Sequence, residues 1–241
     1  NKGFKNSTFK FERREPMKLL LMSGGSHPYE ESTPVLKGFL ESAGHDITLR
    51  EDAEALTDGT LDSSDALVFN TLREGEIALD ESQQESLKNF ISSGKGFVCI
   101  HISGCVPDTW NGYGDITGGG WVMGQSFHPP YSQFTVNVKN DAHPGAAGLS
   151  DFETDDELYM NIDYRDGNDV FLSAEFDGGS YSRNRAGAEE IEMQGGTFPL
   201  AWTRSYGSGK VFVTLLGHDG KSHQNAGFQK LVLNGVDWAT S

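Results

Sequence analysis

Gly96–Ile102 reads GFVCIHI, and His101 is the only residue of this stretch that is neither apolar nor glycine. A run that is apolar on both faces is typical of a central parallel strand covered by helices on both sides of the sheet. We therefore predict a buried strand over residues 96–102, with the imidazole of His101 near its carboxyl end.

The sequence before this strand alternates between strand and helix patterns. Short apolar runs predict strands at Met17–Met22, Ile47–Leu49 and Ala66–Asn70. Apolar residues at helical spacing predict helices at Ser32–Ala43 and Asp80–Ser93, each followed by a glycine that ends it. This alternation predicts an α/β fold with a doubly wound sheet and helices on both of its faces.

The second half of the chain predicts more strands, a hairpin and a closing helix. The strands are expected at Phe134–Val138 and Val170–Phe176, the hairpin at Pro199–Thr203 and Lys210–Leu215 about the turn Tyr206–Gly209, and the helix from about Asn225 to Ala239.

A long irregular segment rich in glycine, Ser103–Pro130, lies between the central strand and these later strands. Such segments inside compact domains are usually functional loops. This one contains Trp110, Tyr113 and Trp121. Their flat rings could stack on a sugar or cover the core, and the sequence leaves both roles open.

Composition limits the classes of function. The chain has 241 residues, of which 36% are hydrophobic and 22% charged, as expected for one folded domain, and it has no apolar run long enough to cross a membrane. Its net charge of −16 repels phosphate backbones and anionic lipids, so neither nucleic acid nor membrane is an expected partner.

The first sixteen residues are basic and precede the first predicted strand. We expect them to form an extension outside a single domain over residues 17–241. Because this extension has no apolar signal-peptide core, a cytoplasmic location is expected.

Several familiar mechanisms have no motif in this chain. It lacks a G-x-S-x-G elbow, a Walker phosphate loop, a G-x-G-x-x-G turn after the first strand and an H-E-x-x-H helix. Its two cysteines, Cys99 and Cys105, form neither a C-x-x-C pair nor a disulfide framework, and we expect free structural thiols.

Three histidines come directly after predicted strands or at their ends. His27 follows the first strand, His101 ends the central one, and His218 with Asp219 follows the apolar run Val211–Leu216. Open α/β sheets bind ligands beyond the carboxyl ends of their strands, so these imidazoles should share one functional edge. Acid–base chemistry, metal binding and a purely structural role are all open to them.

Two loop motifs carry further candidates. His128 lies in SFHPP, between Phe127 and Pro129, and Glu157 lies in DDELY, just before Tyr159. The aromatic continuation suggests that Glu157 turns inward with Tyr159 while the preceding aspartates stay in solvent. An inward glutamate can act as a base, orient a histidine or ligate a metal.

A series of motifs resembles the ThuA-like (trehalose utilisation) family, from about Met17 to Ala239. The motifs are Gly96–His101, Trp110, Gly118-Gly119, His128-Pro129, DAHP at 141–144, DELY at 156–159, Pro199–Trp202, Tyr206–Val211, Leu216–Asp219 and Val236–Ala239.

The resemblance implies the class I glutamine amidotransferase-like fold, a flavodoxin-like doubly wound, mostly parallel sheet that the C-terminal hairpin and helix complete. It places His101 where amidotransferases carry their nucleophilic cysteine and His218 at their catalytic histidine. The pocket is therefore expected to perform chemistry other than glutamine hydrolysis. The family is linked to the use of trehalose and related sugars, and divalent metal binding is implied for some members.

We therefore predict a carbohydrate-processing enzyme, a hydrolase or isomerase of a disaccharide or keto-sugar. His101 and His218 would act as acid and base, and Glu157 would orient one of them. The predicted substrate-binding residues are His27, Trp110, His128, Tyr159 and Asp219.

A metal-assisted version places a divalent metal such as zinc among His101, His128 and His218, with Glu157 as a further ligand. The expected partner is a small-molecule sugar, and a homo-oligomer is the expected assembly. The alternative from another class is a non-catalytic sugar-binding or assembly module that retains an amidotransferase-like pocket.

Overall fold

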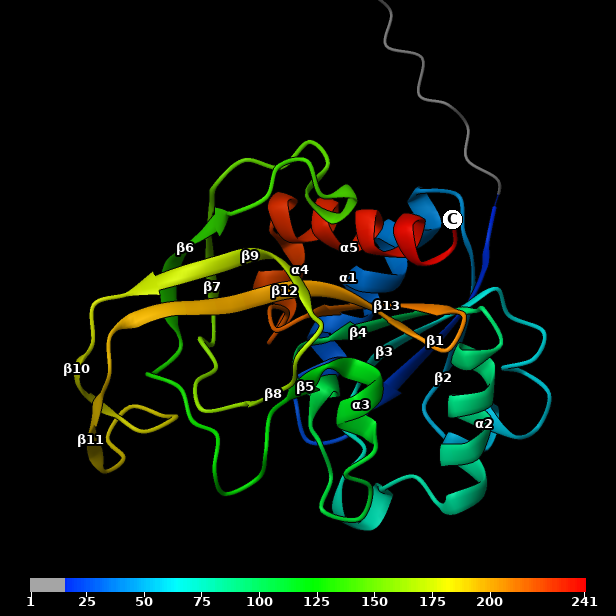
Figure 1. The fold of residues 1–241 in the computed structure, drawn as a ribbon, viewed down its shortest axis with the longest axis horizontal. Helices are drawn as coiled ribbons and strands as arrows, with labels where there is room; N and C mark the ends of the chain where they lie inside the picture. The colour runs from blue at the N-terminus through cyan, green and yellow to red at the C-terminus, as the bar shows by residue number, and fades with distance from the viewer. Residues whose placement is uncertain (1–15) are drawn as a thin grey trace, which may run out of the picture.

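A nine-stranded mixed sheet forms the centre of the structure, a computed structural model that describes residues 16–241 (Figure 1). Its strand order is β2-β1-β3-β4-β13-β12-β9-β6-β7. Residues 1–15, nearly all of the predicted extension, lie outside the described residues. No helix within residues 16–241 is both long and apolar enough to cross a membrane.

Five strands at one side of the sheet run parallel. They are β1 (Lys18–Gly24), β2 (Asp46–Arg50), β3 (Ala66–Thr71), β4 (Gly96–Ile100) and β13 (Gly209–Thr214). All residues of β3 and β4 are buried, as predicted for central strands covered on both faces. In chain order these strands lie 2-1-3-4-5, the doubly wound order that binds ligands at its carboxyl edge.

The other four strands extend the sheet with antiparallel pairing. They are β12 (Gly196–Tyr206), β9 (Asp169–Phe176), β6 (Ser132–Val138) and β7 (Phe152–Asp156). Half of the eight neighbouring pairs are therefore antiparallel, and the predicted mostly parallel sheet is a mixed sheet with a parallel core. β7 was not predicted, because its sequence FETDD is too polar to indicate a strand and it pairs on one side only.

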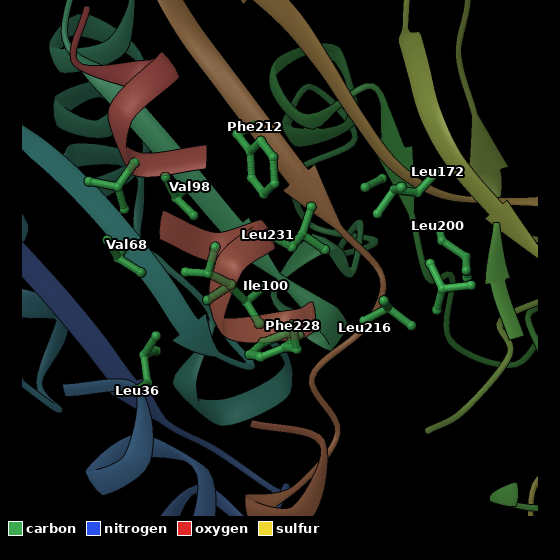
Figure 2. Close-up of a cluster of buried hydrophobic side chains, with 14 of the residues drawn as sticks. Leu36, Val68, Val98, Ile100, Leu172, Leu200, Phe212, Leu216, Phe228 and Leu231 are labelled. Atoms are coloured by element: carbon green, nitrogen blue, oxygen red, sulfur yellow. The ribbon is translucent and has the colours of Figure 1, made fainter. Parts of the chain in front are cut away.

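Helices cover both faces of the sheet, as predicted. The long helices are α1 (Tyr29–Ser42) and α5 (Ala226–Ala239) on one face and α2 (Glu81–Ser92) on the other. Figure 2 shows the core of the first face, in which Leu231 of α5 lies near Phe212 of β13. The same core includes Leu172 and Leu200 of the antiparallel strands, so one core joins both halves of the sheet.

Short elements lie around the sheet. They are α3 (Tyr113–Thr117), α4 (Gly220–Gln224), the paired strands β5 (Gly119–Gly120) and β8 (Asp163–Tyr164), the hairpin strands β10 (Gly179–Ser182) and β11 (Glu190–Met193), and 3-10 turns at Ala53–Leu56, Gly75–Ile77, His101–Gly104 and Pro144–Ala146. The β10–β11 hairpin leaves the main sheet as an arm, at the left of Figure 1.

The central strand is shorter than predicted. It ends at Ile100, and His101 opens a 3-10 turn with a backbone φ of +54°. The apolar pattern continues to Ile102 because the 3-10 turn is buried as well, and so the sequence did not indicate where the strand ends. The imidazole of His101 therefore lies beyond the end of β4.

His223 of α4 is a fully buried histidine close to this edge. Its Nε2 lies 3.1 Å from the carbonyl oxygen of Gly217, and its ring packs at 4.6 Å on Phe228. Burial lowers the pKa of His223 to about 4, because the charged ring would lose its water. The folded state therefore keeps this ring neutral at pH values where the unfolded chain protonates it.

We expect His223→Gln to weaken the pH dependence of stability. In the wild type, the free energy of unfolding should decrease as pH falls from 6.5 towards 4, because only the unfolded state takes up this proton. The difference in the free energy of unfolding between the wild type and the variant, measured by urea titration, should decrease by about 2 kcal/mol between pH 7.5 and pH 4.5. Other titrating groups cancel in this comparison, so a difference that stays constant with pH would contradict the assignment.

Candidate functional site

The carboxylate of Glu157 contacts three imidazoles at the carboxyl edge of the parallel strands. Glu157 comes directly after β7, and its side chain is only 12% exposed. Its Oε2 lies 3.3 Å from Nε2 of His101 and 3.2 Å from Nδ1 of His218. Its Oε1 lies 3.2 Å from Nε2 of His128. Four residues that are far apart in the sequence thus form one cluster, which we call the Glu157 cluster.

His101 is held in a strained backbone conformation. A φ of +54° is rare for a residue with a β-carbon, and such strain is concentrated at functional sites. The buried ring is fixed from both sides: Nδ1 donates to the carbonyl oxygen of Leu215 at 2.7 Å, and Nε2 accepts from the hydroxyl of Tyr159 at 2.6 Å. Burial raises the pKa of Tyr159 well above its usual value, so this hydroxyl stays protonated and acts as the donor.

Backbone carbonyl groups fix the tautomers of three rings. Nδ1 lies 2.7 Å from a carbonyl oxygen in His27, His101 and His128, and the acceptors are Ser26, Leu215 and Pro129. A carbonyl oxygen can only accept, so each Nδ1 carries the proton and each neutral ring presents an unprotonated Nε2. Histidines that ligate metals usually donate their other nitrogen in this way.

Four residues offer ligand atoms close enough to share one metal ion. The ligand atoms of His27, His101, Glu157 and His218 all lie within 4.8 Å of one another. The group differs from the predicted ligand set, because His27 joins it and His128 stays outside. The reason is geometric: His128 approaches Oε1 of Glu157, whereas His101 and His218 approach Oε2.

The charges of this cluster are strongly coupled. Burial opposes ionisation of Glu157, but its contacts with His101 and His218 outweigh burial, and its pKa lies well below the usual value. Burial and the neighbouring His101 and His218 lower the pKa of His27 to about 4. His218 is partly buried, which opposes its charged form, yet Glu157 raises its pKa above the usual value.

The cluster therefore combines an ionised carboxylate with imidazole lone pairs. Burial lowers the pKa of His128, and Nε2 of the neutral ring faces Oε1 of Glu157. A nitrogen lone pair and a carboxylate oxygen repel each other unless a proton or a cation lies near them. Nε2 of His27 is buried and has no hydrogen-bond partner among the described residues. The donor set and its outer hydrogen bonds fit a divalent cation, so the cluster could hold a metal ion.

Asp156 fixes the backbone that carries two members of the cluster, Glu157 and His218. Its fully buried carboxylate accepts from the backbone N–H groups of Gly217 at 2.7 Å, Glu157 at 2.9 Å and His218 at 3.3 Å. The prediction that the aspartates before Glu157 stay in solvent is wrong for Asp156. Burial raises its pKa to about 6, although the hydrogen bonds partly oppose that effect.

Asn184 holds the backbone of His128 and was not predicted. It lies in the turn of the β10–β11 hairpin, where its N–H donates to the carbonyl oxygen of His128 at 2.9 Å and its Oδ1 accepts from the N–H of His128 at 3.0 Å. The preceding residue, Arg183, makes a second contact with this loop: its guanidinium lies over the ring of Phe127 at 5.7 Å. The arm thus clamps the loop that carries His128.

Two predicted substrate-binding residues lie away from the cluster or are engaged elsewhere. Trp110 packs on Tyr113 at 5.1 Å, in a narrow pocket whose lining includes no cluster residue. Asp219 caps α4, where its carboxylate accepts from the N–H of Ser222 at 2.8 Å. Trp121 is the tryptophan near the cluster, 4.6 Å from Tyr159 and 5.8 Å from His128 between ring centres.

Residues 18–239 match the family described as trehalose utilisation, ThuA. The chain belongs to the ThuA family. None of the curated proteins matches its sequence.

Solved structures share the fold of this ThuA family member. A thua-like protein from Parabacteroides merdae is 23% identical, with a TM-score of 0.72 over 94% of this chain and 91% of that one. A GMP synthase subunit from Thermoplasma acidophilum is 13% identical, with a TM-score of 0.55 over 93% and 94%. A beta-galactosidase from Rahnella sp. R3 is 14% identical, with a TM-score of 0.59 over 92% of this chain and 31% of that one. These likenesses agree with an amidotransferase-like fold.

The ThuA chain has no thiol poised as a nucleophile among the residues that the structure describes. Cys99 and Cys105 are free and buried, as predicted, and burial raises the pKa of each to about 12. Nucleophilic cysteines instead have lowered pKa values and some exposure. The strained position at the end of β4 carries the imidazole of His101.

We expect Asn184→Ala to destabilise the protein by about 1 to 2 kcal/mol, because it removes a hydrogen-bond acceptor and leaves a β-carbon at a φ of +66°. Asn184→Asp keeps the acceptor, so its free energy of unfolding should stay near that of the wild type. Asn184→Gly loses the acceptor but tolerates the backbone conformation, so its stability should lie between those of Asn184→Ala and the wild type. Urea titrations give the order. Arg183→Ala is the control for general docking of the arm, and an effect as large as that of Asn184→Ala would contradict a specific clamp.

Proposed function

We propose that this ThuA family member is a carbohydrate-processing enzyme, a hydrolase or isomerase of a disaccharide or keto-sugar. In this proposal His27, His101, Glu157 and His218 hold a divalent metal in the active site. The observation that carries the proposal is the convergence of imidazole nitrogens on the largely buried carboxylate of Glu157.

The donor set favours zinc or another first-row divalent ion. Three imidazole nitrogens and one carboxylate oxygen are ligand types that these ions prefer, whereas magnesium and calcium prefer oxygen ligands alone. When bound, such a metal would act as a Lewis acid that polarises an oxygen of the substrate.

The residues of the chain would divide the remaining work. His218 is the most exposed of the three imidazoles around Glu157. In the loaded site it would serve as a metal ligand, whereas without the ion its raised pKa would suit proton exchange with a substrate near neutral pH. The protonated hydroxyl of Tyr159 can donate a hydrogen bond to a substrate oxygen. His128 contacts Oε1 of Glu157, the oxygen that faces away from His101 and His218. It would therefore orient this carboxylate instead of contacting the sugar.

We expect the purified protein to bind one zinc ion per chain after loading and dialysis, measured by elemental analysis. His101→Ala and Glu157→Gln should each abolish stoichiometric binding, because each removes one ligand. His143→Ala is the matched control: His143 is equally buried, but its ring bonds to Thr203 and to the N–H of Gly145, and its loss should leave metal content unchanged.

Turnover decides between an enzyme and a binding module. The loaded protein is incubated with disaccharides and their keto derivatives, and products are detected by NMR. Turnover that a chelator abolishes supports the proposal. Sugar binding by the loaded protein without any turnover would instead support a non-catalytic module.

Tyr159→Phe should tighten metal binding. In the structure, the Tyr159 hydroxyl donates to the Nε2 atom of His101 that a metal would need, so it competes with the ion. Loss of one such hydrogen bond corresponds to at most about a tenfold gain in affinity, which competition with a chelating dye measures. Weaker metal binding in this variant would show that Tyr159 supports the ion instead.

A further inference from the structure

A cavity of about 600 Å³ opens among the loops, and the proposed function uses none of its residues. This volume lies within the roughly 300 to 1,000 Å³ typical of small-molecule sites. We call it the loop pocket, and its polar lining consists of Asp108, Asn111, Gln125, Asn161, Asp163 and Tyr164.

The loop pocket adjoins the Glu157 cluster through shared segments. Val122 lines the pocket, and the preceding residue, Trp121, places its ring 4.6 Å from Tyr159. The N–H of Val106, another lining residue, donates to the carbonyl oxygen of Trp121 at 2.8 Å. Asn161 comes two residues after Tyr159 along the same segment. The chain segments that line the pocket therefore continue directly into Trp121 and Tyr159, which contact the Glu157 cluster.

Hydrogen-bonding groups in the pocket are left available. Oδ2 of Asp163 pairs with Arg165 at 2.9 Å, while its Oδ1 makes no side-chain hydrogen bond in the described chain. The side chains of Asp108 and Gln125 are exposed and make no hydrogen bond or ion pair within residues 16–241. Asn161 is engaged within the lining, because its Nδ2 donates to the carbonyl oxygen of Gln125 at 3.2 Å.

One aromatic ring faces solvent at this site. Tyr164 is 47% exposed, the largest exposed fraction among the large hydrophobic residues of the described chain, and its ring rests edge-on against the buried Trp202 at 5.9 Å. Amides and carboxylates pair with groups that both donate and accept, as sugar hydroxyls do, and an aromatic face packs on the C–H face of a sugar ring. Two carboxylates in the lining disfavour phosphorylated or acidic ligands.

We propose that the loop pocket is a binding subsite for a neutral sugar ring, with Tyr164 as its stacking platform. The proposal rests on the proposed function, because it supplies a place for the part of a disaccharide that does not react at the Glu157 cluster. It also assigns a role to the irregular segment between β4 and β6, whose tryptophans alone gave no clear site.

Calorimetric titration of the full chain with trehalose tests the subsite. Tyr164→Ala should weaken trehalose binding about tenfold, because it removes the stacking surface. Tyr181→Ala is the matched control: Tyr181 is 37% exposed on β10, outside the pocket lining, and its loss should leave the affinity unchanged. Asp108→Ala, an exposed change with little effect on folding, should also weaken binding, by a smaller factor.

Three outcomes would overturn the subsite. They are equal affinity of Tyr164→Ala and the wild type, tighter binding of glucose 1-phosphate than of trehalose, and absence of binding by trehalose, maltose and sucrose alike. The metal proposal fails separately, because zinc content does not depend on Tyr164. Retained trehalose binding in His101→Ala would confirm that the subsite is independent of the metal ligands.

Discussion

The buried carboxylate of Asp156 is the interaction on which the site depends. It ends β7 in the antiparallel half of the sheet and accepts from the N–H groups of residues 217 and 218, which follow β13 in the parallel half. A buried carboxylate is costly unless its hydrogen bonds are satisfied, so the turn and the end of β7 must stay together. Glu157 and His218 follow directly from this joint, which brings them within contact of each other.

The protonation of the site follows from the backbone around it. Three rings have Nδ1 tied to carbonyl oxygens of the loops, so the direction of each Nε2 is decided by the fold and not by the ring alone. The turn after β4 adds the strained backbone of His101 and thus turns its ring towards Tyr159 and Glu157. The cluster is preorganised before any ligand arrives.

Local patterns were enough to predict much of this structure. The apolar run before His101 indicated a central strand, and the rule that ligands bind beyond strand ends placed the three histidines at one edge. Distant partners were not visible in the sequence. Asp156 looks like part of a solvated acidic run, and two of the three N–H groups that satisfy its buried carboxylate lie about sixty residues later in the chain. His128 was expected among the metal ligands, but its ring contacts Oε1 of Glu157, whereas His101 and His218 contact Oε2, and His27 joins them in the group that could share one ion.

The four proposed metal ligands come from segments that extend from residue 27 to residue 218 of the chain. Contacts of such long sequence separation form late in folding, because the loops between them must close first. We therefore expect the four ligands to come together late in folding. Occupancy of the site by a metal would therefore mark chains that have finished folding, and it would stabilise only those chains.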